Sequence, residues 1–108
     1  MSNKTGPSEK FVLVDSIAYA DKSVVSKTIQ KKPTGNITLF AFDQGEGLSE
    51  HTTPYEALLQ LVDGKAEITI GEHQYILQTG ECIILPANIP HSVKANEKFK
   101  MMLTMIKS

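Results

Sequence analysis

Two segments of this chain, residues 45–64 and 80–95, each begin with a glycine and carry a single histidine. The first reads GEGLSEHTTPYEALLQLVDG and the second reads GECIILPANIPHSVKA. Within both segments apolar and polar residues alternate, a period of two that is typical of β-strands with one buried face. The rest of the chain is therefore interpreted as scaffold around two strand-forming segments that each supply one imidazole.

Further strands are predicted on both sides of these segments. Short apolar and β-branched runs, separated by turn residues, predict strands at 11–17, 23–30, 36–42, 55–62, 65–70, 73–78, 82–86, 91–95 and 99–106, with a loop at 43–50. The dipeptide Asp63-Gly64 predicts a tight hairpin, because glycine accepts positive φ. Further turns are expected at Gly71-Glu72 and Thr79-Gly80. No stretch has sustained helical periodicity, so the pattern predicts an all-β barrel or jelly roll.

The length of 108 residues suits one domain with a single core. We expect a flexible N-terminal tail at 1–10 and a single barrel domain at 11–108. The formal net charge of -1 and the scattered charges argue against nucleic acid and anionic membrane surfaces as partners. No apolar stretch is long enough to span a bilayer, so a cytoplasmic location without membrane association is expected.

The spacing of glycine, proline and histidine in the two segments resembles the cupin superfamily. That family's motifs are G-x5-H-x-H-x3-E-x6-G and G-x5-P-x-G-x2-H-x3-N, folded as a double-stranded β-helix that often holds one metal. The matching residues are Gly45, His51 and Gly64 in the first motif, and Gly80, Pro86 and His91 in the second. The resemblance implies a small single-domain cupin with both histidines inside the barrel.

Four motif positions depart from the family pattern: Thr53 replaces a histidine, Ala57 a glutamate, Asn88 a glycine and Ala95 an asparagine. Among the family's metal-ligand positions, only His51 and His91 keep a ligating side chain. Catalytic zinc normally has three protein ligands, and non-haem iron oxygenases use two histidines and a carboxylate. No cofactor is therefore required, while a divalent metal (Zn, Fe, Mn or Ni) held by His51 and His91 stays an alternative.

Strand parity predicts which side chains face the interior. One face should carry His51, Thr53, Tyr55, Ala57, Leu59 and Leu61, and the other Glu56, Leu58, Gln60 and Val62. If the cupin pairing holds, His51, Thr53, Tyr55 and His91 form a ligand-binding pocket walled by Leu59, Leu61 and Val93. The imidazoles would donate hydrogen bonds to an acidic or carbonyl oxygen of a small organic ligand.

The remaining conspicuous side chains favour structural roles. Cys82 lies in the apolar run CIIL and is expected to be buried, and His73 follows a turn and is expected at the surface. The methionines Met101, Met102 and Met105 are interpreted first as core residues. The outward apolar residues Leu58, Val62, Met102 and Ile106 would leave a patch in water, so a homodimer is expected.

Three functional hypotheses follow, and they leave open whether the protein is an enzyme. The leading one is a cupin that binds a small organic molecule in its barrel without a complete metal site. The second is an enzyme, isomerase-like or dioxygenase-like, that uses His51 and His91 with a metal or uses a histidine as general base. The third is a stability or interaction module that retains the fold without a ligand.

Overall fold

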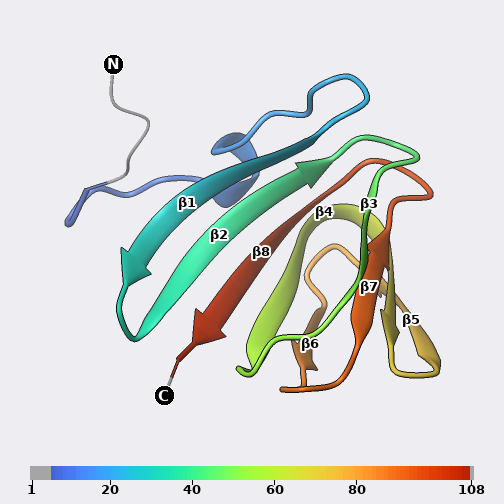
Figure 1. Ribbon diagram of the computed structural model, residues 1–108. Coiled ribbons are helices and arrows are strands. Elements are labelled where there is room, and N and C mark those ends of the chain that lie inside the picture. Colours follow the sequence, from blue (N-terminus) through green and yellow to red (C-terminus); the bar gives the residue numbers. More distant parts are fainter. Residues whose placement is uncertain (1–5, 108) are drawn as a thin grey trace.

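The computed structural model describes residues 6–107, so part of the predicted tail, residues 1–5, lies outside the described residues. The elements are η1 (Leu13–Asp15), β1 (Val24–Lys32), β2 (Gly35–Phe42), β3 (Gly47–His51), β4 (Ala57–Ile70), β5 (His73–Gln78), β6 (Cys82–Leu85), β7 (His91–Lys94) and β8 (Phe99–Ile106). Figure 1 shows the strands curling into a barrel whose two walls face each other. The all-β jelly-roll class is confirmed.

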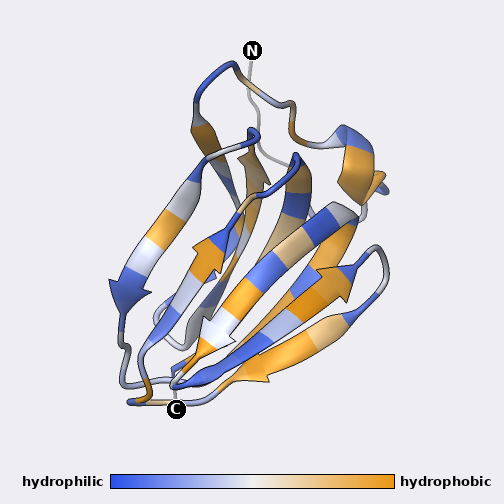
Figure 2. Cartoon of the chain, turned by 90° about the vertical axis from the view of Figure 1, so that its right-hand side faces the viewer, coloured by the Kyte–Doolittle hydropathy of each residue, from blue (hydrophilic) through white to orange (hydrophobic). Residues whose placement is uncertain are grey.

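Two antiparallel sheets form these walls, and β4 belongs to both. We call the strands β1-β2-β8-β4-β6 sheet A and the strands β5-β4-β7-β3 sheet B. The first half of β4 pairs with β8 and β6, and its second half pairs with β5 and β7. Figure 2 shows apolar and polar residues alternating along the strands, as walls with one buried face require.

The predicted hairpin at Asp63-Gly64 is wrong, because β4 continues through both residues. The pairing of β4 with β8 shifts register between Leu61 and Asp63, which marks a β-bulge. Gly64 has φ of 93°. A Cβ at this position would lie 2.4 Å from the carbonyl oxygen of Lys98. The glycine therefore serves the bend that carries β4 from sheet A into sheet B.

Two other expectations from the strand pattern are corrected. Residues 11–17 form no strand but a segment with the short turn η1, closed by a hydrogen bond from Ser16 Oγ to the carbonyl oxygen of Val12 at 2.7 Å. The predicted loop at 43–50 ends early, because β3 begins at Gly47 and pairs with β7. The predicted turns at 71–72 and 79–80 are confirmed, with positive φ at both glycines.

The N-terminal segment packs on the outer face of sheet A. Its residue Ile17 clusters there with Leu39 and Ala41, both 0% exposed. Lys100 reaches from β8 to the segment, where its Nζ donates to the carbonyl oxygen of Val14. Tyr19 completes the attachment by donating from its hydroxyl to Asp63 Oδ2 at 2.9 Å. The outer face of sheet A, which the sequence pattern predicted to be exposed to solvent, is therefore partly covered by the N-terminal segment.

The interior between the two sheets is filled with apolar side chains. At the packed end Phe42 and Phe99 stack with ring centroids 4.5 Å apart, and both are 0% exposed. Met101 is also in this core, as expected. Six partly buried apolar side chains pack against this core: Val24, Phe40, Leu48, Ile70, Ile83 and Leu103. We call the end of the barrel with the stack of Phe42 and Phe99 the floor, and the end where β3 finishes and β7 begins the mouth.

Candidate functional site

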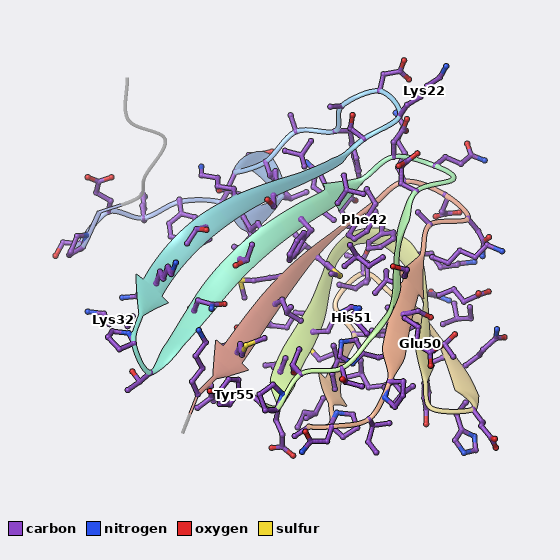
Figure 3. All side chains as sticks on the ribbon, viewed as in Figure 1. Lys22, Lys32, Phe42, Glu50, His51 and Tyr55 are labelled. Atoms are coloured by element: carbon purple, nitrogen blue, oxygen red, sulfur yellow. The ribbon has the colours of Figure 1, made fainter. Side chains whose placement is uncertain are left out.

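The structure brings His51 and His91 together at the barrel mouth. His51 ends β3 and His91 begins β7, and the two residues are direct cross-strand partners. Their ring centroids lie 4.3 Å apart, with the ring planes at 70°. His91 is buried, with 6% of its surface exposed, whereas His51 is exposed. Figure 3 shows His51 on a different level of the barrel from Phe42, which lies at the closed floor.

Backbone hydrogen bonds between loops fix the ends of these two strands. The N–H of Asn88 donates to the carbonyl oxygen of Thr53 at 2.7 Å, and the N–H of Gly71 donates to that of Pro90 at 2.8 Å. Asn88 adopts a φ of 63°, a left-handed conformation that asparagine tolerates better than most residues. The loops that follow β3 and precede β7 are thus tied to their neighbours, which holds the imidazoles in place.

In each imidazole, Nδ1 is hydrogen-bonded to a backbone carbonyl two residues earlier in the chain. Nδ1 of His51 lies 2.7 Å from the carbonyl oxygen of Ser49, and Nδ1 of His91 lies 3.3 Å from that of Ile89. A carbonyl oxygen can only accept, so Nδ1 must be the protonated nitrogen in both contacts. In a neutral imidazole the second nitrogen is then an acceptor. Both rings therefore have an Nε2 lone pair left for a ligand.

Burial and a like neighbour lower the pKa of His91. Desolvation is the larger cause, the nearby His51 adds to it, and the hydrogen bond to the Ile89 carbonyl opposes both. The lowered pKa keeps His91 uncharged at neutral pH, since its ordinary value is near 6.5. The buried member of the pair is therefore available as a hydrogen-bond acceptor or as a general base.

Of the two other residues predicted in the pocket, Thr53 and Tyr55, it is Tyr55 that lies apart from the histidines. Thr53 is half-buried, and its hydroxyl donates to the carbonyl oxygen of Tyr55 at 2.8 Å. The Tyr55 side chain lines a different hollow, an open depression of about 500 Å³ shared with Pro54, Glu56, Ala87 and Ile106. Figure 3 shows Tyr55 near the C-terminal end of β8, apart from His51. Tyr55 lies in the irregular segment between β3 and β4. The strict alternation of side-chain directions that predicted its position does not apply there.

The parity of the regular part of β4 is confirmed. Leu59 and Leu61 are 0% and 2% exposed and point into the barrel, and Val93 on β7 joins them in the core. Glu56 is exposed, as expected. The partly buried apolar side chains that pack against this core include Phe40 and Leu103, which were not identified from the sequence although alternation within 36–42 and 99–106 could have found them.

The side-chain donors at the mouth do not fit the metal that the family often holds. Across residues 6–107 no three or more His, Cys, Asp or Glu side chains are grouped so that they could ligate one ion. Two imidazoles fall one ligand short of the usual catalytic zinc set, because Thr53 and Ala57 replace the other ligands. The histidine pair alone does not form a family-type metal centre.

Two smaller expectations concern other reactive side chains. Cys82 is exposed, so its predicted burial is wrong. On β6 it is Leu85 that is buried, and Cys82 lies on the opposite face of the strand. His73 is exposed, as expected. No helix formed by residues 6–107 is long and apolar enough to cross a membrane.

A jelly-roll barrel with a histidine pair at its mouth defines the class of small cupin-type barrels. A family model for the cupin domain matches residues 38–107, and the chain belongs to this family. A conserved Streptococcus pyogenes protein of unknown function is 30% identical, with a TM-score of 0.90, over 96% of this chain and 91% of that one. A cupin 2 conserved barrel domain protein from Leptotrichia buccalis is 37% identical, with a TM-score of 0.86, over 90% of this chain and 47% of that one.

A cupin superfamily protein from Desulfitobacterium hafniense has a TM-score of 0.90 at 23% identity, over 99% of this chain and 97% of that one, and shows the fold alone. The comparison with curated proteins gave no match. The similar proteins therefore identify the family but name no ligand for this site.

Proposed function

We propose that the protein binds a small organic molecule at the mouth of its barrel, with His51 and His91 as the central polar contacts. One observation carries the proposal: two imidazoles lie 4.3 Å apart at the edge of an apolar core, one exposed and one buried. Small-molecule sites are usually concave and apolar, with a few convergent polar groups that orient the ligand. The mouth has this composition.

The proposal draws support from how differently the two ends of the interior are packed. The floor is filled by the stack of Phe42 and Phe99, which leaves no role there for a ligand. Beside the histidine pair, Ile70, the cross-strand partner of His91, is only partly buried. Covering it with the apolar part of a ligand would remove further surface from water, a favourable contribution that grows with the area covered.

A metal-free enzyme is the second candidate, and the lowered pKa of His91 favours it. A buried, neutral imidazole with a free Nε2 can accept a proton from a bound molecule, and the ideal pKa of a general base lies near the working pH. The enzyme would therefore be isomerase-like, with His91 as the base and His51 as its neighbour.

Cytoplasmic localisation stays a prediction, which cell fractionation tests.

A fragment screen by thermal shift tests the binding proposal. Fragments that raise the melting temperature of the wild type should fail to raise that of His51→Ala or His91→Ala, because both variants lose a mouth contact. Gln78→Ala is the control, since this exposed residue ends β5 and pairs with Lys65, at the end of the strand away from His91. Equal stabilisation of all four proteins by every hit would place binding elsewhere and leave the histidine pair a structural role.

A further inference from the structure

The hydrogen-bond directions at the mouth restrict the chemistry of its ligand. The Nδ1–H groups of His51 and His91 both donate to backbone carbonyls, of Ser49 and Ile89 respectively. The hydroxyl proton of Thr53 is also used, because it points to the carbonyl oxygen of Tyr55. These three of the four polar side chains expected in the pocket have therefore placed their protons in the protein, and what they retain for a ligand is lone pairs.

The hollow that His91 lines contains no cationic side chain that could compensate an anion. Its other lining residues are Glu50, Thr69, Gly71, Pro90 and Ser92, and the carboxylate of Glu50 is the one ionisable group among them. A ligand carboxylate there would face two neutral acceptors and a like charge, and burying an unpaired charge is costly. This arrangement differs from the ligand expected from the sequence, in which the imidazoles donated to an acidic or carbonyl oxygen.

We infer that the ligand of this site is an uncharged molecule with at least one hydroxyl group, which donates its proton to Nε2 of His51 or His91. The inference rests on the proposed function, because it specifies the ligand class of the same mouth. An apolar body would lie against the partly buried Ile70 beside His91, while the hydroxyl groups face the imidazole pair. Dihydroxy compounds with a flat or aliphatic body fit this description best.

Three probe molecules of similar size test whether the site prefers a ligand that donates a hydrogen bond, one that only accepts, or an anion. Resorcinol carries two hydroxyl donors, 1,3-dimethoxybenzene has the same skeleton with both donors methylated, and benzoate carries a carboxylate. Each is titrated at pH 8 with a chelator present, where imidazoles are neutral. The readout is the shift of methyl resonances at Ile70, Ile83 and Leu103 in wild type, His51→Ala, His91→Ala and the control Gln78→Ala.

Resorcinol should shift the mouth methyl resonances of the wild type and of Gln78→Ala. Its affinity should fall about fivefold in either mouth variant, the usual effect of losing one hydrogen bond. 1,3-Dimethoxybenzene should bind roughly tenfold more weakly than resorcinol, and benzoate should bind more weakly still. Equal binding of resorcinol and its dimethyl ether, or tighter binding of benzoate with the same histidine dependence, would overturn the ligand class and leave the proposed function standing.

Failure of all three probes to shift any mouth resonance would count against both the ligand class and the proposed function. A ligand-free measurement tests the inference separately. Long-range ¹H–¹⁵N spectra of the histidine rings at pH 8 should show the proton on Nδ1 of both residues. A proton on Nε2 of either ring would contradict the inference, whatever the probes do.

Discussion

The imidazole of His91 lies edge to face against that of His51, with ring planes at 70° and centroids 4.3 Å apart, and only His51 is exposed to water. The pair is thus asymmetric. His91 is held by burial and by the Ile89 carbonyl, whereas His51 faces the solvent side of the mouth. A ligand entering the barrel would meet His51 first and His91 deeper in.

The pKa of His91 should lie below its ordinary value near 6.5, because burial and the neighbouring imidazole both oppose its charge. Unfolding then takes up a proton, so the contribution of His91 to stability is fully present above about pH 6.5 and is lost as the pH falls through its folded pKa. NMR titration of the ring checks the value. His51→Ala should move the pKa of His91 upward, and a downward move or no change would contradict the account.

Gly64→Ala should destabilise the protein far more than Gly80→Ala. Both glycines have φ near 90°, so both variants carry the cost of a left-handed alanine, about 1–2 kcal/mol. Only at position 64 would the new Cβ meet backbone, at 2.4 Å from the Lys98 oxygen, whereas position 80 is open within 4 Å. The expected further loss is roughly 2 kcal/mol or more by urea unfolding. Equal losses would refute the tight bend in β4.

The strand pattern was predictable because alternation reports burial directly: Ala57, Leu59 and Leu61 alternate in the sequence and point inward together. The hairpin at Asp63-Gly64 was mispredicted for a physical reason. Positive φ suits a hairpin and a bulge equally, and which one forms depends on the pairing of β4 with β8, a contact between distant segments. No local pattern carries that information.

The candidate site was only partly predictable. The meeting of His51 and His91 followed from the family resemblance, since the residues lie on strands far apart in the chain. Tyr55 was misplaced because parity fails outside regular strands, and Cys82 because an apolar run does not reveal which of its faces is buried. The hydrogen-bond direction at each Nδ1 depends on loop carbonyls, which the sequence pattern does not position.

We propose a twofold homodimer through the part of the outer face of sheet A that the N-terminal segment leaves uncovered. Val62 and Met102, expected in this patch, pack instead in the cluster beneath that segment. The remaining patch contains Leu58 and its cross-strand partner Ile84, which is 61% exposed. Exposed apolar surface of this kind marks association sites.

Sedimentation at micromolar concentration should give about twice the chain mass of 11.9 kDa. Ile84→Lys should shift the protein towards monomer, because it places a charge in the patch. Ile76→Lys is the matched control on β5 of sheet B, where Ile76 is 51% exposed. A wild-type monomer across this range, or equal dissociation of both variants, would remove the proposed interface.

Restoring the family's ligands should create a metal site. Thr53→His with Ala57→Glu adds two ligands to His51 and His91, and calorimetry should show strong zinc binding that the wild type lacks. Ala57 is 5% exposed, so the new carboxylate should destabilise the metal-free variant, and zinc should reverse that loss. The control Thr52→His with Ala57→Glu uses an exposed neighbour of Thr53. Equal zinc affinity in both variants would mean that position 53 does not face the histidines.

The central claim is that the mouth of the barrel holds a small molecule against the histidine pair. A high-resolution crystal structure of the protein soaked with resorcinol at pH 8 tests this most directly. We predict density for the ring beside Ile70, the cross-strand partner of His91, with a hydroxyl oxygen within hydrogen-bond distance of Nε2 of His51 or His91. A mouth filled by its own side chains, or resorcinol bound only at other sites, would contradict the account.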